Sequence, residues 1–197
     1  WDPSLTLSVN ISPIQMRDPW FAQKLLKLLA EAKFPPERLE IEVTESCLHE
    51  NIGLVRSLVT SLKNQGVSVS LDDFGTGYAS IAQLRALPFD RIKIDRSFIA
   101  ELGRGGDNSA LVGAISSIGA GMRLPVTAEG IESEHVRDRL RTLGQFKGQG
   151  YFYGRPEPAE KVRARLKSEA RLAEDVRSEP RLAPTKRGDD GRKVAGA

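Results

Sequence analysis

The chain is poor in the residues that build disulfides, zinc sites and membrane spans. Its 197 residues include one cysteine, Cys47, and two histidines, His49 and His135. A single cysteine cannot form a disulfide within the chain, which favours a reducing, cytoplasmic environment. No apolar run reaches the about 18 residues of a membrane helix, so no direct membrane insertion is expected. The first residues carry no secretion signal. The sequence is also compatible with a longer parent protein that another segment anchors to a membrane.

Positive charge is concentrated toward the end of the chain. Residues 161–197 contain 11 Lys and Arg against 6 Asp and Glu, a net charge of +5, whereas the whole chain carries +3. Residues 1–160 therefore carry a net charge of about −2. The last segment is rich in Pro, Gly and charge, so residues 167–197 are predicted to form a disordered basic tail after one folded domain, residues 1–166. A solvated terminus is expected here rather than nucleic-acid binding.

Short runs of alternating apolar and polar residues recur along the chain, and helical patterns separate them. The predicted strands are residues 5–10, 39–44, 67–72, 91–95 and 125–129, with a sixth at 149–153. Apolar residues at helical spacing predict helices over residues 19–33, 50–65 and 110–120. Strand–helix alternation repeated this often predicts a parallel α/β sheet or barrel.

Each predicted strand has one apolar face and one small or polar face. The polar faces carry a carboxylate, an amide or a lysine near the carboxyl end: Asn10, Glu42, Asp72, Lys93 and Glu129. A doubly wound sheet would need both faces apolar, because helices cover both. A barrel has helices only outside, and its catalytic groups lie at the carboxyl ends of its strands. The pattern therefore favours a (β/α) barrel; the alternative is a solvated sheet face.

These side chains, together with Asp73, are expected to meet at one mouth of the barrel. Several close carboxylates repel one another unless a cation lies among them. Oxygen ligands without nearby His or Cys favour Mg²⁺, Mn²⁺ or Ca²⁺ over zinc. Adjacent Asp72 and Asp73 suit two ions roughly 3.5–4 Å apart, an arrangement that activates water, and Lys93 could hold that water or neutralise phosphoryl oxygens. The residues alone thus predict hydrolysis of a phosphate ester.

Six ordered motifs resemble those of one known family. They are, in chain order, SVNIS, EIEVTES, SLDDFGTGY, RIKIDRSFI, TAEGIE and QGYFYGRP, and the match runs from about residue 5 to residue 158. This series resembles the EAL-domain family of cyclic di-GMP phosphodiesterases. The resemblance implies a TIM-like barrel that opens cyclic di-GMP to linear pGpG with Mg²⁺ or Mn²⁺, two ions being expected in the complete domain.

The resemblance also implies roles for individual residues. Asn10, Glu42 and Asp72 match metal ligands, and Asp73 matches a ligand of the second ion. Glu129 matches the carboxylate that joins the metal and water network.

Further matches lie around this centre. Lys93 resembles the water-orienting lysine of the family, and Glu45 the glutamate that steadies the loop after the Asp pair. Gln149 matches a glutamine near the substrate, and Glu132 a further carboxylate of the site.

Two departures from the family pattern stand out. No Glu-Ala-Leu tripeptide occurs, so the barrel is expected to lack its first strand or strands and a helix, together with one metal ligand. Gln145-Phe146 stands where the family usually has Cys-Asp. We therefore expect the 197-residue chain to hydrolyse cyclic di-GMP feebly. The rival interpretation is a non-catalytic module that binds cyclic di-GMP or a protein partner, and a homodimer is compatible with either.

Overall fold

Six parallel strands form one sheet in the computed structural model, which describes residues 2–49, 52–77, 80–103 and 108–169. The strands follow one another across the sheet in chain order, β1 to β6. They are β1 (Leu7–Ile11), β2 (Leu39–Thr44), β3 (Ser68–Phe74), β4 (Arg91–Ile94), β5 (Val126–Ala128) and β6 (Lys147–Gly148). Of the predicted tail, residues 167–197, the first residues belong to the end of a helix, Ala159–Ser168, and those from 170 onward lie outside the described residues.

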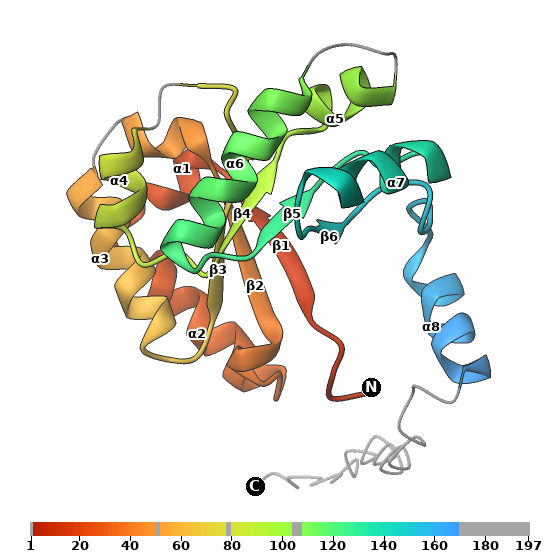
Figure 1. Ribbon diagram of the computed structural model, residues 1–197. Helices are drawn as coiled ribbons and strands as arrows, with labels where there is room; N and C mark the ends of the chain where they lie inside the picture. Colours follow the sequence, from red (N-terminus) through yellow and green to blue (C-terminus); the bar gives the residue numbers. More distant parts are fainter. Residues whose placement is uncertain (1, 50–51, 78–79, 104–107, 170–197) are drawn as a thin grey trace, which may run out of the picture.

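Helices connect the strands and lie along the outer side of the curved sheet (Figure 1). The α-helices are α1 (Pro13–Met16), α2 (Phe21–Glu31), α3 (Ile52–Lys63), α4 (Ile81–Ala86), α5 (Arg96–Gly103), α6 (Ser109–Met122), α7 (Glu134–Leu143) and α8 (Ala159–Ser168). Two 3₁₀ turns flank β2, namely η1 (Pro36–Arg38) and η2 (Glu45–His49). All three predicted helices are present as α2, α3 and α6, with their ends shifted by a few residues.

The strand order identifies the architecture as part of a TIM-like barrel. A doubly wound sheet reverses its order at a switch point, whereas here each new strand adds on the same side. The outward faces of β2 to β5 are apolar and buried against the helices, as at Ile41, Val69 and Ile92. The inward faces carry buried polar groups instead, among them Ser70 and Thr127. The predicted barrel with helices only outside is confirmed.

The sixth predicted strand was placed wrongly. The chain pairs with β5 through Lys147 and Gly148, and residues 151–153 form a turn. The Phe152 N–H donates to Ile131 O at 3.0 Å, so this segment folds back on the loop after β5. Gly150 permits the approach, because a Cβ there would lie 2.3 Å from the Ile131 backbone. Apolar aromatic residues here therefore mark a turn and not a strand.

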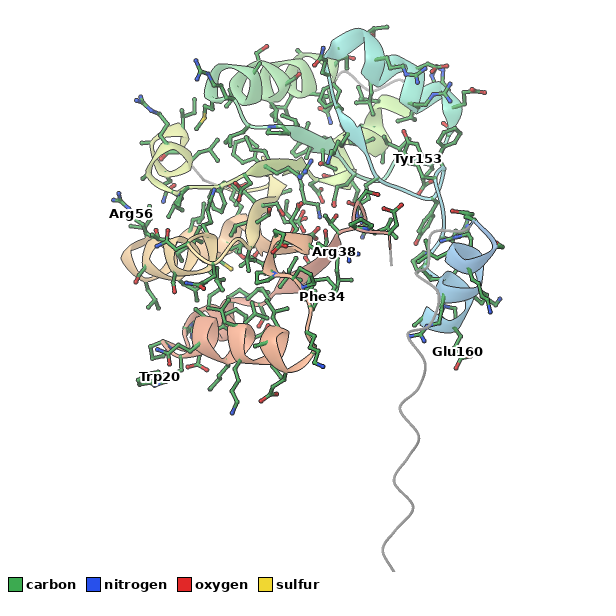
Figure 2. The ribbon with its side chains drawn as sticks, turned by 90° about the horizontal axis from the view of Figure 1, so that it is seen from below. Trp20, Phe34, Arg38, Arg56, Tyr153 and Glu160 are labelled. Carbon is green, nitrogen blue, oxygen red and sulfur yellow. The ribbon has the colours of Figure 1, made fainter. Side chains whose placement is uncertain are left out.

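The first strand forms an open edge of the sheet. Among the described residues β1 pairs with β2 alone, and Leu7 and Val9 on its outward face are 44% and 40% exposed. We expected helices to cover this face, which holds for β2 to β5 but not for β1. Arg38 fixes the segment ahead of β1 by donating from Nε to Leu5 O (2.9 Å), and its guanidinium lies over the Phe34 ring (Figure 2).

Helix α8 lies at the far end of the structure from α2, as the positions of Glu160 and Trp20 in Figure 2 show. It follows the turn after β6 and begins directly after Pro158. Within the described residues, no helix combines the length and the apolar composition needed to cross a membrane.

Candidate active site

A buried lysine is the centre of the polar cluster inside the partial barrel. Lys93 of β4 has a side chain that is 3% exposed, and its Nζ lies 2.6 Å from both Glu42 Oε2 and Glu129 Oε1. A third carboxylate, Asp72, is 3.4 Å away. Burial alone would lower the pKa of Lys93, but the hydrogen bonds with Glu129 and Glu42 outweigh it and raise the pKa. Lys93 is therefore an ammonium group that donates to acidic partners from two other strands.

Asp72 and Asp73 both reach the site because the end of β3 is irregular. Successive residues of a regular strand point to opposite faces. Here the register between β3 and β4 shifts between Leu71 and Phe74, and Asp73 has a left-handed φ of +54°. The extra residue and this backbone turn bring the second carboxylate to the same side as the first. Carboxylate oxygens of Asp72, Asp73 and Glu129 all lie within 4.8 Å of one another.

Asp95, which follows β4, also belongs to this cluster, although our sequence reasoning left it out. It lies beside Asp73, and the two carboxyl groups shift each other's pKa, upward at Asp73 and downward at Asp95. Burial, and then the charges of Asp72 and Asp95, raise the pKa of Asp73. Burial would also raise the pKa of Asp95, but hydrogen bonds from Ser97 hold it below its usual value. The alternation that placed Lys93 on the inner face also placed Asp95 there, so the signal was present.

The donors of this cluster fit a divalent cation. Five carboxylates, from β2, β3 and the residues directly after β4 and β5, meet one ammonium here: Glu42, Asp72, Asp73, Asp95, Glu129 and Lys93. Burial raises the pKa of Glu129, and its ion pair with Lys93 only partly offsets this. The excess negative charge at Asp72, Asp73 and Glu129 is what hard oxygen-preferring ions such as Mg²⁺ and Mn²⁺ neutralise.

Asn10 completes the inner ring from β1. With its amide nitrogen turned toward the carboxylates, it donates to Asp72 Oδ2 (3.2 Å) and Glu42 Oε2 (3.3 Å). With its oxygen turned inward, the same side chain would join those carboxylates as a ligand of a cation. The position of Asn10 therefore fits both the metal-free and the metal-bound site.

Glu45 holds the loop that follows the two aspartates. Its buried Oε2 accepts hydrogen bonds from Gly75 N (2.9 Å) and Gly77 N (3.2 Å). Gly75 has φ +99°, a conformation that favours glycine, and it directly follows β3. The glutamate thus connects the end of β2 to the loop after β3.

Gln149 and Glu132 lie outside this compact cluster. Gln149 follows β6, and its backbone bonds to Ala128 O and Ile131 N while its side chain is exposed. Glu132, in the loop after β5, is exposed as well. Both lie in loops at the carboxyl ends of strands, where a barrel binds its substrate.

The raised pKa values of Asp73 and Glu129 predict how stability depends on pH without metal. The folded state holds these protons more tightly than the unfolded state, so the stabilisation is present below about pH 4, where unfolded carboxyls titrate, and is lost as pH rises through the folded pKa values. In EDTA, the double variant Asp73→Asn/Glu129→Gln should lose less stability than the wild type between about pH 4 and 7. Urea unfolding at several pH values measures this. If the unfolding free energy of the variant and of the wild type fell equally with pH, the prediction would be contradicted.

Comparison with known proteins agrees with this geometry. The sequence matches the EAL domain family model over residues 1–156. It is 37% identical to the cyclic di-GMP phosphodiesterase PdeR of Escherichia coli over 156 residues, which is 79% of this chain and 24% of PdeR.

Two solved structures are also similar to the chain. The MucR phosphodiesterase of Pseudomonas aeruginosa, in complex with c-di-GMP, gives a TM-score of 0.76 at 37% identity over 80% of this chain and 64% of that one. A manganese and cyclic di-GMP complex of Klebsiella pneumoniae BlrP1 gives 0.69 at 26% identity, over 77% of this chain and 39% of that one.

The chain spans only about a fifth to a quarter of the length of the curated relatives it matches. The family model, however, covers most of the chain, including β1 to β6 and the acidic cluster. The chain therefore belongs to the EAL-domain family.

Proposed function

We propose that this domain hydrolyses cyclic di-GMP to linear pGpG in a reaction that depends on Mg²⁺ or Mn²⁺. The observation that carries the proposal is the group of Asp72, Asp73 and Glu129 around buried Lys93 at the barrel mouth. Relatives named as cyclic di-GMP phosphodiesterases and structures solved with that nucleotide support the choice of substrate.

The residues that would hold the ions are Asn10, Glu42, Asp72, Asp73 and Glu129. Bound ions supply Lewis acidity, which lowers the pKa of water and neutralises charge on phosphoryl oxygens. Asp73, whose pKa the charges of Asp72 and Asp95 raise, would give up its proton more readily once positive charge enters the cluster.

Lys93 acts in this proposal as a hydrogen-bond donor and not as a base. Its raised pKa keeps Nζ protonated, so it can orient the oxygen of a water molecule and stabilise negative charge on phosphorus-bound oxygens. Glu129, with its raised pKa and its contact with Nζ, is the carboxylate placed to accept a proton from that water.

The reaction adds one water to one phosphodiester of the ring. The water oxygen bonds to phosphorus, the bond from phosphorus to the ribose 3′ oxygen breaks, and that oxygen leaves with a proton. The product is linear, with a 5′ phosphate at one end. Glu45 would keep the loop after the Asp pair in place, whereas Gln149 and Glu132 would contact the nucleotide from neighbouring loops.

A module that binds cyclic di-GMP without hydrolysing it is the second candidate. The absence of a Glu-Ala-Leu tripeptide and the open β1 edge favour it for the 197-residue chain. The cytoplasmic location and the homodimer remain predictions.

Turnover assays with Mn²⁺ separate these candidates. The chain should be compared with a version joined at its N-terminus to a segment that carries a Glu-Ala-Leu strand, with Asp72→Ala as control, and pGpG measured by chromatography. We expect the extended protein to be at least about 100-fold faster. Loss of a residue that only supports a metal ligand typically costs about 10–100-fold, and loss of the ligand itself should cost more. We expect Asp72→Ala to be inactive. Nucleotide binding without product in the extended protein would favour the binding module, and robust turnover by the 197-residue chain would contradict the expected feeble activity.

A further inference from the structure

A second set of polar contacts lies inside the barrel, one step below the acidic cluster. The Arg91 Nε is 3.2 Å from Glu40 Oε1, and its Nη1 donates to Thr127 Oγ1 at 3.4 Å. The Arg91 and Glu40 side chains are 16% and 14% exposed, and Thr127 is buried. Within the described residues, the side-chain contacts of Arg91 and Glu40 are with each other and with Thr127, none of which is proposed to bind metal or substrate.

This lower set repeats the arrangement around Lys93. In both sets a glutamate on β2 contacts a cationic side chain on β4, across β3. The same cation contacts a residue at or directly after β5. The upper members, Glu42, Lys93 and Glu129, each stand two residues after their lower counterparts, Glu40, Arg91 and Thr127. Because a strand repeats its direction every two residues, the two sets share one face and one diagonal.

The side chain at position 91 is suited to fixing the spacing of strands. A guanidinium is planar and presents its donors in a rigid fork, whereas an ammonium is a point charge on a flexible stem. Arg91 contacts β2 through Nε and β5 through Nη1. The rigid guanidinium therefore fixes the distance between β2 and β5 and how far one is shifted along the other. Ser70 of β3 pairs with Arg91 in the sheet and leaves room for the bridge to pass over it.

The upper set depends on the same offset. Lys93 Nζ lies 2.6 Å from carboxylates of both neighbours, and a displacement of about 1 Å at an active site can cost 100-fold in rate. We propose that Arg91, with Glu40 and Thr127, is a positioning residue that holds Lys93 between Glu42 and Glu129. This inference rests on the proposed function for its kinetic consequence but not for its structural one.

The variant Arg91→Met tests the proposal. Under Mn²⁺ saturation we expect kcat for cyclic di-GMP to fall about 10–100-fold with KM changed less than about twofold, because the contacts described for Arg91 are with Glu40 and Thr127 and not with Gln149 or Glu132. In the metal-free chain, acylation of Lys93 by acetic anhydride, mapped by mass spectrometry, should become about tenfold faster as the lysine loses its fixed partners. Arg91→Lys should recover part of both effects.

Arg139→Met is the matched control for loss of a partly buried arginine. Arg139 donates to Leu102 O (2.9 Å) and Ser109 Oγ (3.1 Å), outside the barrel interior. We expect both Arg139→Met and Arg91→Met to lower the midpoint of urea unfolding. Arg139→Met should leave kcat and the rate of Lys93 acylation unchanged. Equal behaviour of the two variants in all three measurements would reduce Arg91 to a general structural role and overturn the proposal.

The failure of the proposed function would be recognised separately. If the wild-type chain, extended or not, neither binds Mn²⁺ nor forms pGpG, the proposed function fails. The acylation rates of Lys93 in Arg91→Met and Arg139→Met then still decide whether Arg91 positions Lys93.

Discussion

Lys93→Met is expected to lower the unfolding free energy of the metal-free chain by about 3–5 kcal/mol, the usual effect of breaking a buried ion pair on one side. Methionine keeps the length and the apolar part of the side chain but removes the charge. Glu42 and Glu129 then lose a partner at 2.6 Å, and Asp72 loses one at 3.4 Å. Urea unfolding in EDTA measures the loss.

Addition of Mn²⁺ should restore part of this stability, since a cation at the cluster replaces the missing positive charge. Turnover of cyclic di-GMP should nevertheless fall about 10²–10³-fold, because the donor that orients water is gone. Lys147→Met is the control. Lys147 is exposed, and in the sheet it stands beside Thr127 of β5, which stands beside Lys93 of β4 on its other side. A loss of less than about 1 kcal/mol in Lys93→Met, the range of an exposed pair, would contradict our account of the site.

The alternation of residue types was enough to predict most of the barrel. In β2 the bounds 39–44 match the structure, because Leu39, Ile41 and Val43 are buried outward while Glu42 faces inward. The same reasoning failed at residues 149–153, where backbone hydrogen bonds to the loop after β5 override the aromatic pattern. It also failed to predict the exposed face of β1, because a strand's pattern does not reveal whether a helix covers it.

The candidate site was predicted in its members but not in its contacts. Polar residues at the carboxyl ends of parallel strands must share one edge, so Asn10, Glu42, Asp72 and Lys93 could be grouped from sequence. That Lys93 pairs with β2 and β5 simultaneously depends on strand register, which pattern alone does not fix. The contact of Asp73 with Asp95 depends on a bulge and a left-handed residue, neither of which alternation reveals.

The lower set of Arg91 and Glu40 was missed for the same reason. Glu40 lies on the polar face of β2 and Arg91 begins β4, so each alone is typical of a solvated strand end. Only the register that places Arg91 beside Ser70 brings the guanidinium across β3 to Glu40. Residues that position others are therefore harder to predict than the residues that carry the chemistry.

Asp73→Asn is expected to change stability and metal binding in opposite directions. Asparagine is nearly isosteric, tolerates the φ of +54° and can still hydrogen-bond to Asp95. It removes a charge that burial, Asp72 and Asp95 all disfavour, so the metal-free chain should become more stable at pH 7. Thermal unfolding in EDTA measures this gain. Asp73→Ala, which lacks the tolerance for this conformation, should not show it.

The same variant should bind Mn²⁺ at least about 100-fold more weakly, since it loses a carboxylate of the cluster. At a Mn²⁺ concentration of 100 times the wild-type Kd, the ion stabilises the wild type by about 2.7 kcal/mol, and a 100-fold weaker site gives only about 0.4 kcal/mol. Asp73→Asn should therefore unfold at a higher temperature than the wild type in EDTA and at a lower one in Mn²⁺. A reversal of this kind is expected only if repulsion around Asp73 exists in order to hold a cation. If the two proteins keep the same order in both conditions, Asp73 is an acidic residue of the fold and not a ligand.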